Sequence, residues 1–103
     1  MKDNLQKSVE KYNLINRSWE AFWQTYDSYI SEQPEESSAV GLIDRSSIKA
    51  VVDCVFFKTY LQEDRSEIVV RIEIFNTDDK NIGYFDCIFD ETGNDFNYYF
   101  VTE

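Results

Sequence analysis

The chain has no histidine, and only two cysteines, three glycines and one proline among its 103 residues. Without histidine it lacks the usual general base near neutral pH, the partner of serine and cysteine nucleophiles, and the commonest metal ligand. Two cysteines are too few for a structural zinc site. The glycines, Gly41, Gly83 and Gly93, stand too far apart to form a loop that cradles a phosphate. We therefore expect a protein that is not an enzyme and that binds no metal or cofactor.

Acid pairs in predicted turns are the remaining candidates for such chemistry. Asp78 adjoins Asp79, and Asp90 lies close to Glu91 and Asp95. Side chains of adjacent turn residues diverge, and neither segment has the spacing of a calcium-binding loop. Solvated turns are therefore the better interpretation of these acids.

Bases are also scarce, with 10 lysines and arginines against 20 acids, a formal charge of −10 and a pI of about 4.3. Nucleic acids and anionic lipids are polyanions, so neither is expected as a direct partner, and a basic protein is favoured instead. The N-terminus is polar and the strongest apolar run, VVDCVFF, is interrupted by Asp53. No targeting or membrane segment is predicted, and a cytoplasmic location is expected.

The pattern predicts a single α+β domain over residues 1–103, with a long helix over 1–33, a polar connector at 34–38 and an antiparallel sheet over 39–103. Apolar residues recur every three or four positions up to Ile30, and Pro34 disfavours helical geometry at Gln33. Asp3 with Gln6 resembles a capping pair. Such a helix would be roughly 42 Å long, which is more than a small sheet needs, so a kink or an overhanging end is expected.

Everything after the connector alternates with period two, which predicts a meander of four to five strands. The strands are expected at 39–43, 48–61, 67–76, 82–90 and 96–102. The residues predicted to face the helix are Ala50, Val52, Cys54, Phe56, Tyr60, Ile68, Val70, Ile72, Ile74, Phe85, Cys87 and Phe89. Those predicted to face away are Val51, Asp53, Val55, Phe57, Val69, Arg71, Glu73, Phe75, Tyr84, Asp86, Ile88, Asp90, Asn97, Tyr99 and Val101. Cys54 and Cys87 are interpreted as reduced core thiols, with a disulfide between neighbouring strands left open.

The segment 73–103 combines eight acids and eight aromatic residues with one base, Lys80. Because one helix covers only one face of a sheet, part of this acidic aromatic surface must point away from it. We expect that surface to contact a basic partner or a second copy of the chain. The predicted contact residues are Glu73, Tyr84, Asp86, Asp90, Asp95 and Tyr99. Trp19 and Trp23, one helical turn apart, are expected to anchor the helix to the sheet, with a role as binding anchors as the alternative.

The runs SSIKAVVD, VVRIEIF and IGYFDCIFDETGN, with the D-x-T-G turn of Asp90, Thr92 and Gly93, are similar to the immunity proteins of bacterial polymorphic toxin systems. The small α+β type called TriTu is the nearest, although Phe75 stands where that type has a strand tryptophan. The resemblance covers roughly residues 46–103. It implies a cytoplasmic protein, encoded beside a toxin, that binds and blocks it.

Other classes share the same charge. A phage-type nuclease inhibitor that mimics nucleic acid would space its carboxylates along the whole molecule, whereas this chain has four bases among the acids of its first 36 residues (Lys2, Lys7, Lys11 and Arg17). A homodimeric domain that holds a small apolar ligand between helix and sheet is the other alternative.

Overall fold

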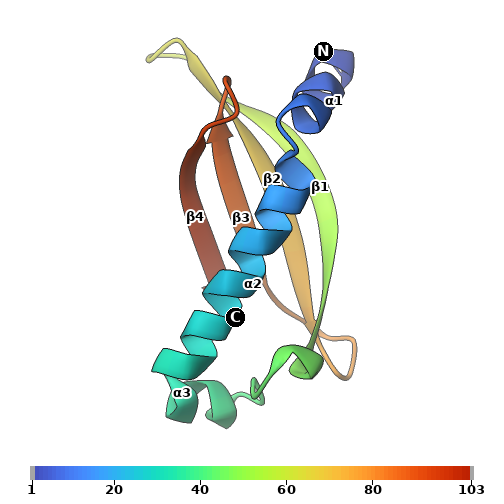
Figure 1. Cartoon of the computed structure of the whole chain (residues 1–103), viewed down its shortest axis with the longest axis vertical. Helices are drawn as coiled ribbons and strands as arrows, with labels where there is room; N and C mark the ends of the chain where they lie inside the picture. Colours follow the sequence, from blue (N-terminus) through green and yellow to red (C-terminus); the bar gives the residue numbers. More distant parts are fainter. Residues whose placement is uncertain (1, 103) are drawn as a thin grey trace.

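The computed structural model describes residues 2–102, without the side chains of residues 2–4, 95 and 96. Three helices, α1 (Lys2–Lys11), α2 (Leu14–Glu32) and α3 (Pro34–Ala39), and a short 3-10 turn, η1 (Arg45–Ser47), precede four strands. The strands β1 (Ile48–Tyr60), β2 (Arg65–Asn76), β3 (Asn81–Asp90) and β4 (Asp95–Thr102) form an antiparallel meander in chain order. Helix α2 crosses one face of the curved sheet (Figure 1). The α+β prediction is confirmed.

The predicted long helix is broken between α1 and α2, as its excess length suggested. Asn13 takes the left-handed conformation with φ 55° and ψ 43°, which asparagine tolerates better than most residues. The Arg17 guanidinium donates to the carbonyl of Tyr12 at 3.1 Å and to that of Gly93 at 2.7 Å. A Cβ on Gly93 would lie 2.3 Å from the Tyr12 ring, so glycine lets the break dock on the β3–β4 turn. The predicted cap by Asp3 falls on a side chain outside the described set.

Two predictions for the segment after α2 are wrong. Pro34 does end α2, but it also serves as the first residue of α3, because the fixed φ and missing N–H of proline suit a helix start. The predicted connector is therefore helical. Residues 39–43 are not a strand, because Gly41, with φ 82°, closes α3 with hydrogen bonds from Leu42 N to Ser37 O and from Gly41 N to Ser38 O.

The core lies between α2 and the sheet. Leu14, Phe22 and Tyr26 of α2 have no exposed surface, and the Phe22 ring lies 5.6 Å from that of Phe85 on β3. The predicted inward sets of β2 and β3 are confirmed, since their members are all at most 1% exposed: Ile68, Val70, Ile72, Ile74, Phe85, Cys87 and Phe89.

Strand β1 departs from its prediction in the second half. The register with β2 shifts between Val52 and Cys54, so Asp53 forms a bulge. A bulge adds one residue and exchanges the faces of all that follow. Val55 and Phe57 therefore pack against the core, while Cys54 and Phe56 face away from α2. Cys54 and Cys87 are not joined by a disulfide, because they lie on opposite faces of the sheet.

Candidate partner-binding surface

The sheet face that points away from α2, here called the outer face, has two adjacent cross-strand rows near its middle. The valine row joins one residue from each strand: Val51, Glu73, Tyr84 and Val101. The arginine row is the neighbouring set: Cys54, Arg71, Asp86 and Tyr99. Side chains directly opposite each other on adjacent strands are in contact range, so each row is a continuous strip across the sheet.

Exposure is uneven across these rows. Val51 is 41% exposed, Val101 37% and Tyr99 51%, whereas Asp86 is only 8% exposed. In the next row, Val69 and Ile88 are also buried, whereas Asn97 at its end is exposed. Within these two rows the most exposed side chains are therefore apolar or aromatic, with Glu73 and Tyr84 between the two valines. Lys49, Lys58 and Asn97 are exposed elsewhere on the outer face.

Asp86 is held by Arg71 within the chain. The guanidinium donates from Nε to Oδ1 and from Nη2 to Oδ2, both at 2.8 Å. The guanidinium carbon also lies 4.3 Å from the Tyr84 ring centroid and 5.7 Å from that of Phe56. The hydrogen bonds from Arg71 to Asp86 raise the pKa of this arginine above its ordinary value. The negative charge of the Asp86 carboxylate is therefore balanced by Arg71 within the chain.

Two other predicted contact acids also have partners in the chain. Asp90 Oδ1 accepts hydrogen bonds from the Thr92 N–H and hydroxyl at 2.9 and 2.6 Å and from the Asn94 N–H at 3.0 Å. The Thr92 hydroxyl and then the Asn94 N–H hold the pKa of Asp90 below its ordinary value. Glu73 accepts from Asn81 Nδ2 at 2.6 Å.

The predicted site thus falls into three parts. Glu73, Tyr84, Asp86 and Tyr99 meet on the outer face, as alternation predicted. Asp90 lies apart from them, where β3 ends at its turn. The side chain of Asp95 is outside the described set. Tyr99 lies opposite Asp86, and its hydroxyl accepts a hydrogen bond from Asn97 Nδ2 at 3.1 Å.

Arg71, Val51 and Val101 are residues of these two rows that the predicted contact set did not include. The alternation of the strands already assigned all three to this face, so the sequence did predict their positions. What was missing was the β2–β3 register, which places Arg71 opposite Asp86. With that pairing, an arginine and an aspartate in separate strands become one neutral unit.

A second exposed feature lies on α2. The rings of Trp19 and Trp23 stack with centroids 6.4 Å apart and planes 18° apart, and both pack partly against the core. The Arg45 guanidinium lies 4.9 Å from the Trp23 ring and pairs with Asp27 at 2.7 Å. Together with Glu20 and Gln24, these residues line an open depression of about 510 Å³. Both tryptophans therefore anchor the helix, as expected, and keep part of their surface exposed.

Within residues 2–102, no helix combines the length and hydropathy that a membrane span requires. In the same described part of the chain, no cluster of three or more Cys, Asp and Glu side chains is arranged to hold a metal ion. Comparison with protein-family models, curated proteins and solved structures finds no match to this chain. The function must therefore be inferred from the residues themselves.

Proposed function

We propose that this chain is a non-catalytic binding protein that covers a basic region of a protein partner. The observation that carries this proposal is the outer face, where Val51, Val101 and Tyr99 are exposed beside Glu73 and Tyr84. None of the helices in the described part of the chain packs over them, because α2 lies on the opposite face (Figure 1). Exposed tyrosines and branched aliphatic side chains on a rigid sheet are suited to anchor a protein contact at low entropic cost.

Electrostatics decide the kind of partner. The chain carries −10, which favours rapid association with a positively charged protein surface and disfavours nucleic acid. Buried aromatic contacts would then set the rate of dissociation. Arg71 and Asp86 together carry no net charge. Arg71 therefore adds little repulsion toward a basic partner at the centre of the contact.

The resemblance to immunity proteins supplies the more specific form of the proposal. A toxin that cleaves nucleic acid needs a basic cleft, and an acidic protein with an apolar contact face can cover it. Such a protein would act in the cytoplasm of the cell that makes the toxin. The outer-face acids support binding over catalysis, because Asp86 and Asp90 are engaged with Arg71 and with their own turn rather than converging in a cleft.

The alternative of a ligand carrier has less support from the packing. Phe22, Tyr26 and Phe85 fill the space between α2 and the sheet and have no exposed surface. The apolar material is therefore used for the core and not to line a central cavity.

The test is affinity capture of the tagged chain from its native host, followed by mass spectrometry and titration calorimetry with the captured partner. We expect a stoichiometric basic protein to be retained, and Tyr99→Ala with Val101→Ser to weaken its binding by roughly tenfold or more, as loss of anchor residues does. Both sites are exposed, so the stability of the variant should change by less than about 1 kcal/mol.

The matched control is Leu61→Ser, which removes an apolar side chain that is 91% exposed in the β1–β2 turn, away from the outer face. It should bind as the unaltered chain does. Equal binding by the Tyr99 and Val101 variant would remove the outer face from the proposal. A clean homodimer that this variant dissociates would assign the face to self-association.

A further inference from the structure

The two edges of the sheet differ in how they are protected. An edge strand exposes unpaired N–H and C=O groups, and proteins usually protect it with bulges, lysines or prolines. Strand β1 has the Asp53 bulge and carries Lys49 and Lys58. Strand β4 pairs with β3 in unbroken register from Asn97 to Thr102, and this stretch has no charge, proline or glycine. The β4 edge is therefore regular from Asn97 to Thr102. Its register shift lies before this stretch, opposite Ile88 and Phe89, and the Tyr98 N–H donates to Asn97 Oδ1 at 2.9 Å.

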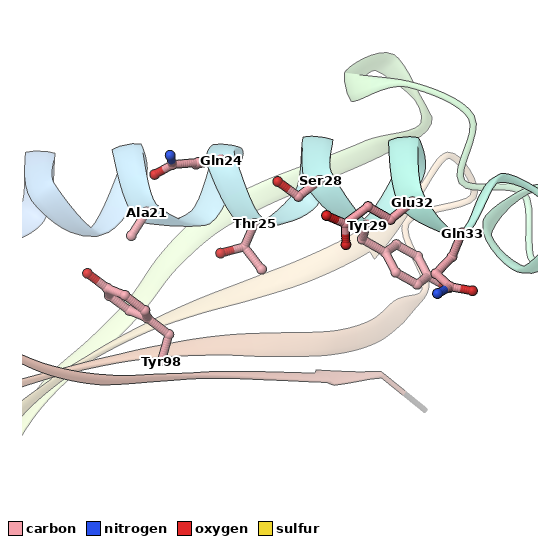
Figure 2. A pocket seen from close by; sticks show the side chains of 8 residues that line it. All are labelled: Ala21, Gln24, Thr25, Ser28, Tyr29, Glu32, Gln33 and Tyr98. Carbon is pink, nitrogen blue, oxygen red and sulfur yellow. The ribbon is translucent and has the colours of Figure 1, made fainter.

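A groove runs between this edge and helix α2, with a volume of about 460 Å³. Figure 2 shows α2 forming one wall with short or polar side chains, among them Thr25, Ser28 and Glu32, while the Tyr98 ring rises from β4 toward the helix. Tyr98 is 41% exposed. Small side chains on the helix wall leave room beside β4 for the side chains of an additional strand.

The two chain segments that form the groove contain acids and no bases. From Ser18 to Asp44 the chain has six acids (Glu20, Asp27, Glu32, Glu35, Glu36 and Asp44) and no base. Residues 81–103, which include β3 and β4, also contain no lysine or arginine. Glu32 lines the groove itself, and the described residues around it include no base. The last turn of α2, whose carbonyl groups carry the negative end of the helix dipole, contains no base either.

The geometry points to a strand-addition site, in which β4 pairs with an extended segment of a partner protein that carries lysine or arginine at alternate positions. Backbone hydrogen bonds to the β4 edge supply the pairing, and alternate side chains of the added strand enter the groove beneath α2. There they meet Glu32 and the negative end of the helix. This surface is distinct from the outer face, because Tyr98 and Tyr99 point to opposite sides of β4.

The experiment uses the whole chain and two synthetic peptides of about nine residues, long enough to match a typical strand. One peptide alternates lysine with valine, and the other alternates glutamate with valine. Amide hydrogen exchange read by mass spectrometry or NMR should show protection of the β4 amides by the lysine peptide alone. No added protection of β4 amides, or protection by both peptides alike, would overturn the proposal.

Charge variants on one helix make the test specific. Glu32→Lys reverses a charge in the groove, and Glu20→Lys makes the same change in the depression beside Trp19 and Trp23. Both positions are exposed, so both variants should fold. Glu32→Lys should weaken binding of the lysine peptide roughly fivefold to tenfold, and Glu20→Lys less than about twofold, because exposed charges act over short distances. An equal effect of the two variants would show attraction by net charge alone and contradict a groove site.

Self-association is the remaining outcome to separate. If the chain by itself sediments as a dimer whose β4 amides are already protected, and Tyr98→Lys returns it to a monomer, the edge belongs to a second copy and the proposal fails. Loss of the outer-face contact leaves all of these results unchanged, so failure of the proposed function and failure of this inference are distinguishable.

Discussion

The two faces of the sheet achieve burial by different means. The inner face is closed by α2 and consists of apolar and aromatic side chains such as Phe85 and Ile72, both with no exposed surface. No helix or strand of residues 2–102 packs over the outer face, yet Asp86 is 8% and Ile88 7% exposed there. Long side chains lying flat on the sheet, above all Arg71 between Tyr84 and Phe56, provide the cover. On the outer face the Arg71–Asp86 pair and the neighbouring rings are thus used in intramolecular contacts, whereas Val51, Val101 and Tyr99 are among the described side chains that stay exposed for a partner.

The largest expected effect tests the inner face. Phe85→Ala should lower the free energy of unfolding by about 3–5 kcal/mol, because it leaves a cavity beside Phe22 in the core. Its sequence neighbour provides the control, since Tyr84→Ala on the outer face should cost roughly 1 kcal/mol through the loss of the Arg71 contact. Urea denaturation measures both. Similar losses at the two positions would contradict the difference between the faces.

A smaller effect tests the role of charge on the outer face. Asp86→Ala should cost about 2 kcal/mol, because it leaves Arg71 without its bidentate partner in a site where these side chains are 31% and 12% exposed. Adding Arg71→Met should restore much of the loss, since an unpaired cation is then no longer present. The two unfolding free energies form the measurement. A loss below about 0.5 kcal/mol for the single variant would show that the pair is not structural.

Asp86 and Asp90 are predicted contact residues, so Asp86→Lys with Asp90→Lys is the charge reversal that the sequence suggests as a test of partner binding, but these contacts argue against its use. Reversal at Asp86 would set a lysine against Arg71, and reversal at Asp90 would remove three hydrogen bonds from the β3–β4 turn. We therefore expect this double variant to be destabilised, and the exposed residues Tyr99 and Val101 are better positions for testing the surface.

The smallest effect concerns the hydroxyl of Tyr26, the fully buried tyrosine of α2. Burial first, and then Asp44 and Asp27, raise the pKa of Tyr26 to about 12, and its hydroxyl donates to the Asp44 carbonyl at 2.8 Å. The folded chain then keeps a proton that the unfolded chain releases near pH 10, so this contribution is complete below pH 10 and is lost as the pH rises toward 12. Tyr26→Phe should show a shallower alkaline decline in the free energy of unfolding. Parallel declines for the two proteins would contradict it.

Local patterns in the sequence were enough for the inward sets of β2 and β3 and for the end of α2 before Pro34. They predicted either a kink or an overhanging end for the long helix, and the structure has a break at Asn13. The bulge at Asp53 was not predictable in the same way. A bulge depends on how β1 pairs with β2, and nothing in the alternation of β1 marks the extra residue. It exchanged the faces of Cys54, Val55, Phe56 and Phe57 at once. The strand predicted at 39–43 failed because a short alternating run cannot outweigh the helix ending at Gly41.

For the candidate surface, the sequence by itself determined the composition. It determined that the chain is acidic, lacks histidine and has aromatic residues on both sides of β4. Only the tertiary structure decided which acids are accessible, because strand register pairs Arg71 with Asp86 and a turn engages Asp90. Only the tertiary structure decided, too, that β4 is an edge strand beside the base-free part of α2. The physical reason is that residue type and alternation are local properties, whereas ion pairing, burial and edge exposure depend on which strands become neighbours.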